Sequence, residues 1–235
     1  MSLRQRWDYL RHLAVACTQQ HHKELAPIFR PYVPEGGTVI DAGAHAGQFA
    51  KLFSQMVGPT GRVCAFEPSG YTRAILERAL SFNRYRNVQV YALGLSDRPG
   101  ELVLHTPVKR SGVRGYGLAS FGGVGAAAAR GEIAETVPVT TLDAFVRSNA
   151  LRVDFIKADI EGWEGHFLRG ARGVLRTQRP AIFIELNREM LARAGEDADQ
   201  LFADLAALGY RAQKSPEWRA VAAFEGRGDY LFTAA

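Results

Sequence analysis

The stretch Thr-Val-Ile-Asp-Ala-Gly-Ala-His-Ala-Gly at residues 38–47 restricts the possible folds more than any other part of the chain. An apolar strand runs into Asp41, and Gly43 and Gly47 follow just before a helical pattern begins. Gly43 permits a sharp turn, and Gly47 lets the next helix pack closely with its N-terminal N–H groups toward a ligand. A strand, a glycine turn and a helix in this order are typical of the first unit of an open α/β sheet with a ligand site at its edge.

A second predicted strand, 62–66, ends in an acid, Glu67. An acidic side chain at the end of this strand can accept hydrogen bonds from the two hydroxyls of a ribose. The run from Gly43 to Gly47 lacks the middle glycine that admits a pyrophosphate in dinucleotide-binding loops. Asp41 suits a cationic amino-acid group and would repel a phosphate. The motif therefore favours S-adenosylmethionine over a dinucleotide, although an ordinary strand–turn–helix corner has the same spacing.

Beyond this motif, strand and helix patterns alternate, which predicts a mostly parallel sheet covered by helices on both faces. Strands are expected at 38–42, 62–66, 87–91, 101–105, 153–158 and 181–186, and helices at 46–57, 70–82, 141–148, 163–177 and 189–208. The segment 136–140 is predicted to be a short edge strand, because Pro138 cannot donate to a ladder. Residues 210–214 and 230–233 fit a closing pair of strands. We expect a seven-stranded Rossmann-like sheet with a C-terminal antiparallel strand.

The chain has 235 residues, which suits one α/β domain and is too short for two full ones. Residues 1–36 are predicted to form an N-terminal helical extension, and 37–235 the main domain. No apolar run reaches about 18 residues, so no stable membrane insertion is expected. The two cysteines, Cys17 and Cys64, fall in a predicted helix and a buried strand. This cysteine usage predicts a reducing, cytoplasmic location without a disulfide.

Basic residues mark two segments outside the sheet pattern. In the extension, arginines stand beside Trp7 and Leu10, an arrangement that suits contact with a membrane surface. A helix that packs against the core has the same pattern, and we favour that interpretation. Residues 106–131 form a Gly-rich loop that carries Lys109, Arg110, Arg114 and Arg130. This loop is either a flexible lid that attracts an anionic acceptor or a solvated surface loop.

Nucleic acid is not an expected partner, because aromatic residues are not interleaved with the basic ones. The oligomeric state is not indicated by the sequence. His12, His21 and His22 lie in the predicted N-terminal helices, with no Cys or acidic cluster at ligand spacing. We therefore interpret them as surface histidines rather than zinc ligands.

A second informative stretch is Asp-Phe-Ile-Lys-Ala-Asp-Ile-Glu-Gly-Trp-Glu at 154–164. In a strand, Lys157 and Asp159 point to the same face, and Glu161 follows at the turn. A lysine in an apolar strand needs a carboxylate partner, and Asp159 or Glu161 is the natural one. The pair is either a structural ion pair or part of a catalytic site that accepts the proton of an attacking hydroxyl.

Taken together, these runs resemble the FkbM-type methyltransferases, which belong to the S-adenosylmethionine-dependent Rossmann-like group. The matching segments are 39–47, Phe-Glu-Pro at 66–68, Thr-Leu-Asp at 141–143, 154–164 and Pro-Ala-Ile-Phe-Ile-Glu-Leu-Asn at 180–187. The resemblance implies O-methylation of a hydroxyl on a small molecule or glycan, such as a sugar or a polyketide-type natural product. His45 departs from the family, which often has Asn there. The first 36 residues, the 106–131 loop and the tail after 190 are not covered, and we expect them to select the acceptor.

The resemblance and the strand-end acids give the candidate site. The cofactor-binding candidates are Asp41, Gly43, Ala44, His45, Gly47, Glu67, Pro68, Ala92, Leu93 and Asp159. The expected base is Asp159. The side chains expected to orient the acceptor or tune that base are Lys157, Glu161, Glu185 and Asn187. Asp159, Glu185 and Asn187 are also hard oxygen ligands compatible with Mg²⁺, but a metal-free carboxylate cluster is favoured.

Two other functional classes stay open at this stage. A nicotinamide-dependent oxidoreductase has a similar sheet, but the missing middle glycine and the Lys-x-Asp-x-Glu-Gly run argue against it. A non-catalytic binding module with the same fold is the other alternative, because a fold does not establish turnover.

Overall fold

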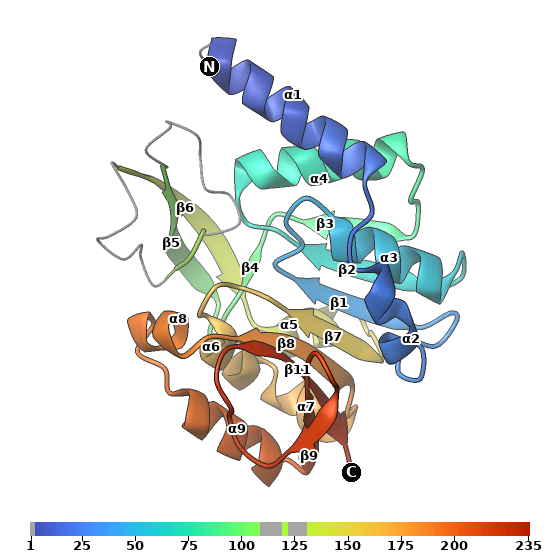
Figure 1. Cartoon of the computed structure of the whole chain (residues 1–235), viewed down its shortest axis with the longest axis vertical. Helices are drawn as coiled ribbons and strands as arrows, with labels where there is room; N and C mark the ends of the chain where they lie inside the picture. The colour runs from blue at the N-terminus through green and yellow to red at the C-terminus, as the bar shows by residue number, and fades with distance from the viewer. Residues whose placement is uncertain (1–2, 109–118, 122–130) are drawn as a thin grey trace.

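The computed structural model describes residues 3–108, 119–121 and 131–235. In these residues the main sheet has eight strands in the order β10-β9-β11-β8-β7-β1-β2-β3 (Figure 1). Its strands are β1 (Thr38–Ala42), β2 (Arg62–Phe66), β3 (Val88–Tyr91), β7 (Phe155–Ala158), β8 (Ala181–Leu186), β9 (Tyr210–Lys214), β10 (Arg219–Val221) and β11 (Gly228–Ala234). Strands β3, β2, β1, β7 and β8 are parallel, and β11 runs antiparallel to β8. The predicted Rossmann-like sheet with its C-terminal antiparallel strand is confirmed, and β10 is an additional strand.

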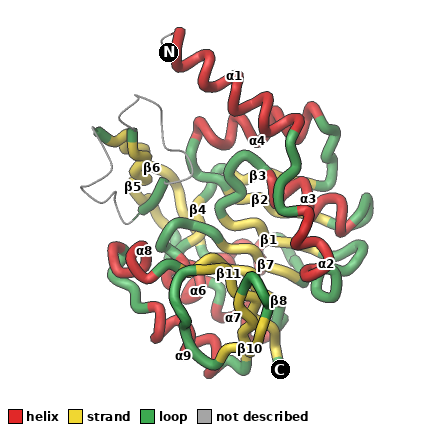
Figure 2. Tube along the Cα trace, viewed as in Figure 1, coloured by secondary structure: helices red, strands yellow, loops and turns green. Residues whose placement is uncertain are grey.

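Helices lie on both sides of this sheet, as Figures 1 and 2 show. They are α1 (Leu3–Thr18), α2 (Ala26–Phe29), α3 (Gln48–Val57), α4 (Gly70–Phe82), α5 (Leu142–Ser148), α6 (Glu164–Gly170), α7 (Arg172–Thr177), α8 (Arg188–Arg193) and α9 (Ala198–Ala207), with a 3₁₀ turn at Lys23–Leu25. Successive residues of a strand point to opposite faces. Val39 therefore packs in one core with Phe29 and Phe53, and Ile40 packs in the other with Leu142.

The predicted N-terminal extension is packed onto the main domain. Phe29 is fully buried in the same core as Val39. Helix α1 lies on α4, where Ala16 packs against Ala79. The buried ammonium of Lys51 donates to the carbonyl oxygens of Ala16 at 2.7 Å and Gln19 at 2.8 Å. These bonds satisfy carbonyl groups at the C-terminal end of α1 and fix that end of the helix.

A second, smaller sheet stands beside the first, with strands β4 (Gly94–Leu95), β6 (Glu132–Thr140) and β5 (Gly100–Pro107) in that order. The prediction that 136–140 is an edge strand is wrong, because β6 lies between β4 and β5. Pro138 is tolerated there because β4 is only two residues long and pairs with Val139 and Thr140 alone. The segment 101–105 belongs to this sheet as part of β5.

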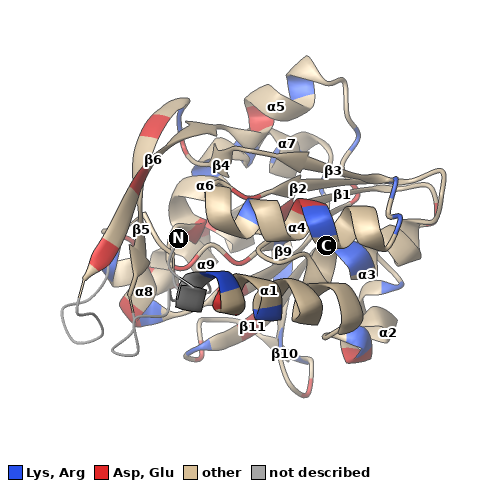
Figure 3. Cartoon of the chain, turned by 90° about the horizontal axis from the view of Figure 1, so that it is seen from above, with Lys and Arg blue, Asp and Glu red and all other residues tan. Residues whose placement is uncertain are grey.

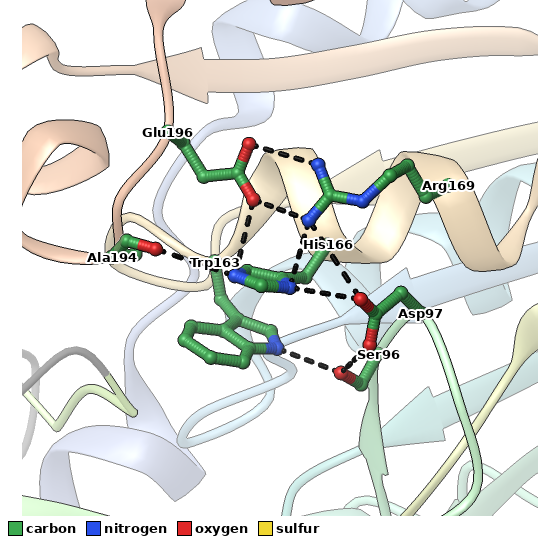
Figure 4. Close-up of polar contacts among 7 residues, drawn as sticks. All are labelled: Ser96, Asp97, Trp163, His166, Arg169, Ala194 and Glu196. Carbon is green, nitrogen blue, oxygen red and sulfur yellow. Dashed lines mark hydrogen bonds and ion pairs between the residues drawn. The ribbon is translucent and has the colours of Figure 1, made fainter.

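A polar network joins the small sheet to the helices of the main domain (Figure 4). The indole N–H of Trp163 donates to Ser96 Oγ at 3.1 Å, and its ring stacks on His166 at 3.8 Å. His166 lies between Asp97 at 3.2 Å and Glu196 at 3.1 Å. The network therefore connects the segment after β4, helix α6 and the loop before α9.

Two predicted helices are each divided in the structure. The segment 163–177 forms α6 and α7, and 189–208 forms α8 and α9. Gly170 ends α6 against the backbone of Ser96, where a Cβ atom would overlap the Ser96 carbonyl oxygen. Gly195, between α8 and α9, has a φ of +76°, which ends the first helix. No helix in the described residues combines the length and apolarity that crossing a bilayer requires.

Candidate active site

A pocket opens at the carboxyl ends of β1 and β7, where ligands bind in parallel α/β sheets. The predicted site residues on its wall are Gly43, Ala44, His45, Glu67, Pro68, Lys157, Asp159 and Glu161. Three separate segments of the sequence, one after each of β1, β2 and β7, thus meet in one place. The structure brings most of the predicted site together.

The glycine loop after β1 is held against its neighbours by backbone contacts. Gly43 has a φ of +75°, and a Cβ atom there would overlap the carbonyl oxygen of Asp159. Gly47 has a φ of +88°, and a Cβ atom there would lie 2.6 Å from Leu76. The N–H groups of Gly43 and Ala44 donate to the Phe66 oxygen at 3.1 and 2.9 Å. Both glycines are therefore required by conformation and by close packing, as the sequence indicated.

Glu67 combines burial with a fixed orientation at the pocket wall. One carboxylate oxygen accepts the His45 N–H at 2.9 Å, and the other accepts the Ser69 N–H at 2.9 Å. Burial raises the pKa of Glu67 to about 7, against the opposing effect of these hydrogen bonds. Each carboxylate oxygen has a further acceptor direction, so the group can bind two neighbouring hydroxyls. This geometry fits the ribose of S-adenosylmethionine.

Asp41 and Lys157 form a buried pair beneath the loop. The ammonium nitrogen of Lys157 lies 3.3 Å from Asp41 Oδ1 and 3.9 Å from Asp159 Oδ2, and it donates to the Gly43 oxygen at 2.7 Å. Burial raises the pKa of Asp41 despite the attraction of Lys157. For Lys157, burial acts to lower the pKa, but Asp41 and Asp159 together outweigh it and raise the pKa. Asp41 has no exposed surface and is not on the pocket wall, so it supports the loop from behind.

Acidic side chains gather at the ends of β7 and β8. Burial, with the charges of Asp159 and Glu185, raises the pKa of Glu161 to about 8. At neutral pH most Glu161 side chains are therefore protonated and can donate a hydrogen bond. Glu185 lies near this cluster but off the pocket wall, and Arg227 donates to its carboxylate at 3.1 Å. Burial also raises the pKa of Asp229 to about 6, with Glu185 and Asp159 contributing.

The structure places several other candidates away from the pocket wall. Gly47 is buried against α4, and Ala92 and Leu93 follow β3 beyond the pocket. Asn187 caps α8, where its side-chain oxygen accepts the Glu189 N–H at 3.0 Å. Across the described ranges, no three His, Cys, Asp or Glu side chains converge on a metal-binding geometry. The basic residues of the 106–131 loop that the sequence singled out lie outside the described residues.

Sequence reasoning missed several residues of the pocket wall. His22 lines the pocket, and its ring stacks on Phe49 with centroids 4.4 Å apart. His22 is a surface histidine, with 42% of its side chain exposed, and it also forms part of the pocket wall. Leu104 of β5 and Phe121 line the same pocket from the side of the small sheet. No sequence signal marks these residues, because only the tertiary fold brings them to the strand ends.

Comparison with known proteins identifies the family. The model of the methyltransferase FkbM domain matches residues 41–212. No curated protein matches the chain. Among solved structures, a methyltransferase FkbM from Methylobacillus flagellatus superposes with a TM-score of 0.53 at 14% identity. The match covers 96% of this chain but 59% of that one, so the chain spans less than two thirds of that relative.

Two further solved structures share the fold. One is an S-adenosylmethionine-dependent O-methyltransferase from Thermotoga maritima, with a TM-score of 0.51, 14% identity and coverage of 93% of this chain and 67% of that one. The other is an S-adenosylmethionine-dependent methyltransferase from Aquifex aeolicus, with a TM-score of 0.50, 14% identity and coverage of 94% and 98%. At this identity the likeness shows the fold alone, which is that of S-adenosylmethionine-dependent methyltransferases. The match to the domain model covers most of the chain, which therefore belongs to the methyltransferase FkbM family.

Proposed function

We propose that this protein transfers the methyl group of S-adenosylmethionine to a hydroxyl of a sugar, glycan or natural-product acceptor. One observation carries the proposal. Asp159, a partly exposed carboxylate, lines the same pocket as the glycine loop and Glu67. A group that takes a proton and a group that suits a ribose therefore face one cavity.

The cofactor has a natural orientation in this pocket. S-adenosylmethionine supplies a methyl group on a positively charged sulfur, which leaves as a neutral thioether. Glu67 would accept hydrogen bonds from the ribose hydroxyls, and the loop from Gly43 to His45 would contact the methionine part. Ala92 and Leu93 would flank the adenine beyond the end of β3. Asp41 would act from behind the loop, through its ion pair with Lys157.

The acceptor hydroxyl must lose its proton as its oxygen bonds to the methyl carbon. Asp159 would take this proton, because its carboxylate lines the pocket and is partly exposed there. The raised pKa of Glu161 suits a different role, the donation of a hydrogen bond that orients the acceptor. Glu185 would act indirectly, through its charge near Glu161. Positioning in line with the sulfur–carbon bond would supply much of the rate.

The test begins with the cofactor. Calorimetric titration with S-adenosylhomocysteine and with NAD separates the classes, and we expect binding of the first only. Tritiated S-adenosylmethionine is then incubated with the protein and a panel of hydroxylated sugars, glycans and polyketides, and the labelled product is analysed by NMR for an O-methyl signal. Binding of NAD alone would contradict the proposal and favour the nicotinamide-dependent class. Cofactor binding without methyl transfer to any acceptor of a cell-extract metabolite pool would support the binding-module alternative. An N-methyl product would exclude O-methylation.

A further inference from the structure

Helix α1 exposes large apolar side chains on the face that points away from the domain. Trp7 is 73% exposed and Leu10 is 54% exposed. The sequence pattern favoured packing of this helix against the core, and part of it does pack, since Ala16 is buried on α4. Trp7 and Leu10 lie on the opposite side. Isolated exposed apolar residues are ordinary, but neighbouring ones on an otherwise packed helix need a partner.

The positions along the helix place these side chains in one stripe. Trp7, Leu10 and Ala14 are spaced by three and four residues, so they share a face, and all three are exposed. The exposed side chains of Arg6 and Arg11 flank the stripe on its two sides. Figure 3 shows α1 beside α4 with basic residues on its ribbon.

The charge of this face is almost entirely positive. The acid within α1 is Asp8, and its carboxylate lies 4.0 Å from Arg11. Asp8 is turned toward the domain, with 22% of its side chain exposed. An apolar stripe that carries Trp and Leu between arginines is the composition of a helix that lies in a lipid–water interface.

We propose that α1 binds an anionic bilayer surface, with Trp7 and Leu10 at the boundary between head groups and acyl chains. Arg6 and Arg11 then contact lipid phosphates on either side of the stripe. The helix lies in the plane of the interface and does not cross it. Because the C-terminal end of α1 is fixed by Lys51, the whole domain is held at the surface with it.

A second copy of the chain is a poorer occupant of this face. A helix of 16 residues is about 24 Å long, and its single exposed stripe is small beside the roughly 800 Å² per partner of a stable interface. Two such faces would also bring Arg6 and Arg11 of both copies together. No exposed acid on the described face offsets that repulsion, whereas lipid phosphates do.

The direction of α1 relates this face to the pocket. In Figures 1 and 3, the N-terminal end of the helix points to the side where β5 and β6 lie. Leu104 of β5 lines the pocket, and so does His22, which follows α1 in the chain. A bilayer bound by α1 would lie on the outer face of that helix, and the N-terminal end of the helix points to the same side as β5, which contributes Leu104 to the pocket wall.

Sedimentation of the full chain with sucrose-loaded vesicles tests the proposal. Vesicles of phosphatidylcholine alone are compared with vesicles containing 30% phosphatidylglycerol. We expect binding to the anionic vesicles that weakens at least tenfold from 50 to 300 mM salt, as screening of the arginines requires. The W7S/L10S variant should lose at least tenfold in vesicle affinity at low salt. Both side chains are exposed, so its melting temperature should stay within a few degrees of the wild type.

Matched variants distinguish a specific effect of the exposed α1 face from the general effect of changing apolar or basic side chains on the surface. V103S removes an exposed apolar side chain from β5, and R84E/R86E inverts two exposed arginines before β3. Both should bind vesicles like the wild type, whereas R6E/R11E should not. Equal binding by W7S/L10S and wild type, or absence of phosphatidylglycerol-dependent binding, would overturn the proposal. A wild-type dimer in light scattering that W7S/L10S abolishes, without vesicle binding, would assign the face to a second copy.

Discussion

Lys157 and Asp41 are register partners on adjacent parallel strands, and the Lys157 ammonium lies 3.3 Å from the Asp41 carboxylate. Both side chains are buried, with 1% and 0% of their surfaces exposed. The same ammonium donates to the Gly43 oxygen, so the ion pair also fixes the backbone of the glycine loop. A buried ion pair therefore holds the glycine loop of the proposed cofactor site in place.

Removal of one partner of this pair should be strongly destabilising. K157M leaves the Asp41 carboxylate buried without its cation, which costs about 3–5 kcal/mol in comparable pairs. Urea denaturation should show this loss of unfolding free energy for K157M. The double variant D41N/K157M has no uncompensated charge and should recover much of it. A K157M variant within 1 kcal/mol of wild type would contradict this account of the pair.

The pair also illustrates how far the sequence could predict the site. A carboxylate partner for Lys157 was required by burial, but Asp159 and Glu161 were the expected candidates. Asp41 is the nearer one because β1 and β7 are neighbours, while well over one hundred residues separate the two side chains in the chain. Strand ends and their acids follow from local patterns, whereas strand order depends on long-range packing.

The missed elements have the same physical origin. The two-residue strand β4 is too short for a periodic pattern and is defined by its pairing with β6. His22 and Phe121 reach the pocket from outside the sheet pattern, so no local signal marks them. In α1, apolar residues occupy two faces, and the sequence does not show that Trp7 is on the exposed one.

The acidic cluster predicts that stability falls as the pH rises. Burial raises the pKa of Glu161 from its ordinary 4.5 to about 8. Below pH 4.5 both folded and unfolded chains hold this proton. Between pH 4.5 and about 8 the unfolded chain releases it first, so the free energy of unfolding decreases with pH. Glu67 and Glu164, with pKa values raised to about 7 by burial, act in the same direction.

Thermal unfolding across pH 5 to 8.5 measures this effect. We expect E161Q to have a flatter profile than wild type, because the amide has no proton to lose. E189Q, at an exposed position on α8, is the matched control and should leave the slope unchanged. Identical slopes for E161Q and wild type would exclude Glu161 as a contributor.

A glycine-to-alanine change in α6 should destabilise the protein although alanine is the better helix former. A Cβ atom on Gly170 would overlap the Ser96 carbonyl oxygen, which belongs to the backbone beside β4. Overpacking of this kind costs about 1–3 kcal/mol, more than the roughly 1 kcal/mol that alanine gains in a helix. G165A in the same helix meets the Glu196 side chain rather than backbone, and this side chain can shift at the cost of its contacts with His166 and Arg169, so the variant should lose less. Chemical denaturation measures the free energy of unfolding of both variants. A stabilised G170A would show that the backbone at Ser96 moves to accommodate the Cβ atom at little cost.

Glu67 should govern cofactor affinity. E67Q keeps the shape of the side chain but loses the charge that accepts the His45 and Ser69 N–H groups and the ribose hydroxyls. Charge-assisted hydrogen bonds contribute about 1.5–3 kcal/mol, so the Kd for S-adenosylhomocysteine should rise roughly 10- to 100-fold. Calorimetry measures this change, with E135Q as a control on β6, outside the pocket wall. An unchanged Kd for E67Q would remove Glu67 from the proposed ribose site.

Substitution of Asp159 should reduce the rate of methyl transfer while leaving cofactor affinity almost unchanged. D159N keeps the shape of the pocket wall but cannot take the proton of the acceptor hydroxyl, and loss of a general base reduces rates by about 10²–10⁴-fold. The Kd for S-adenosylhomocysteine should stay within about threefold of wild type, because Glu67 and the glycine loop are unchanged. Single-turnover transfer to the acceptor found in the screen gives the rate, and calorimetry gives the Kd. Full transfer by D159N would assign the proton to another group, with His22 on the same pocket wall as the next residue to vary.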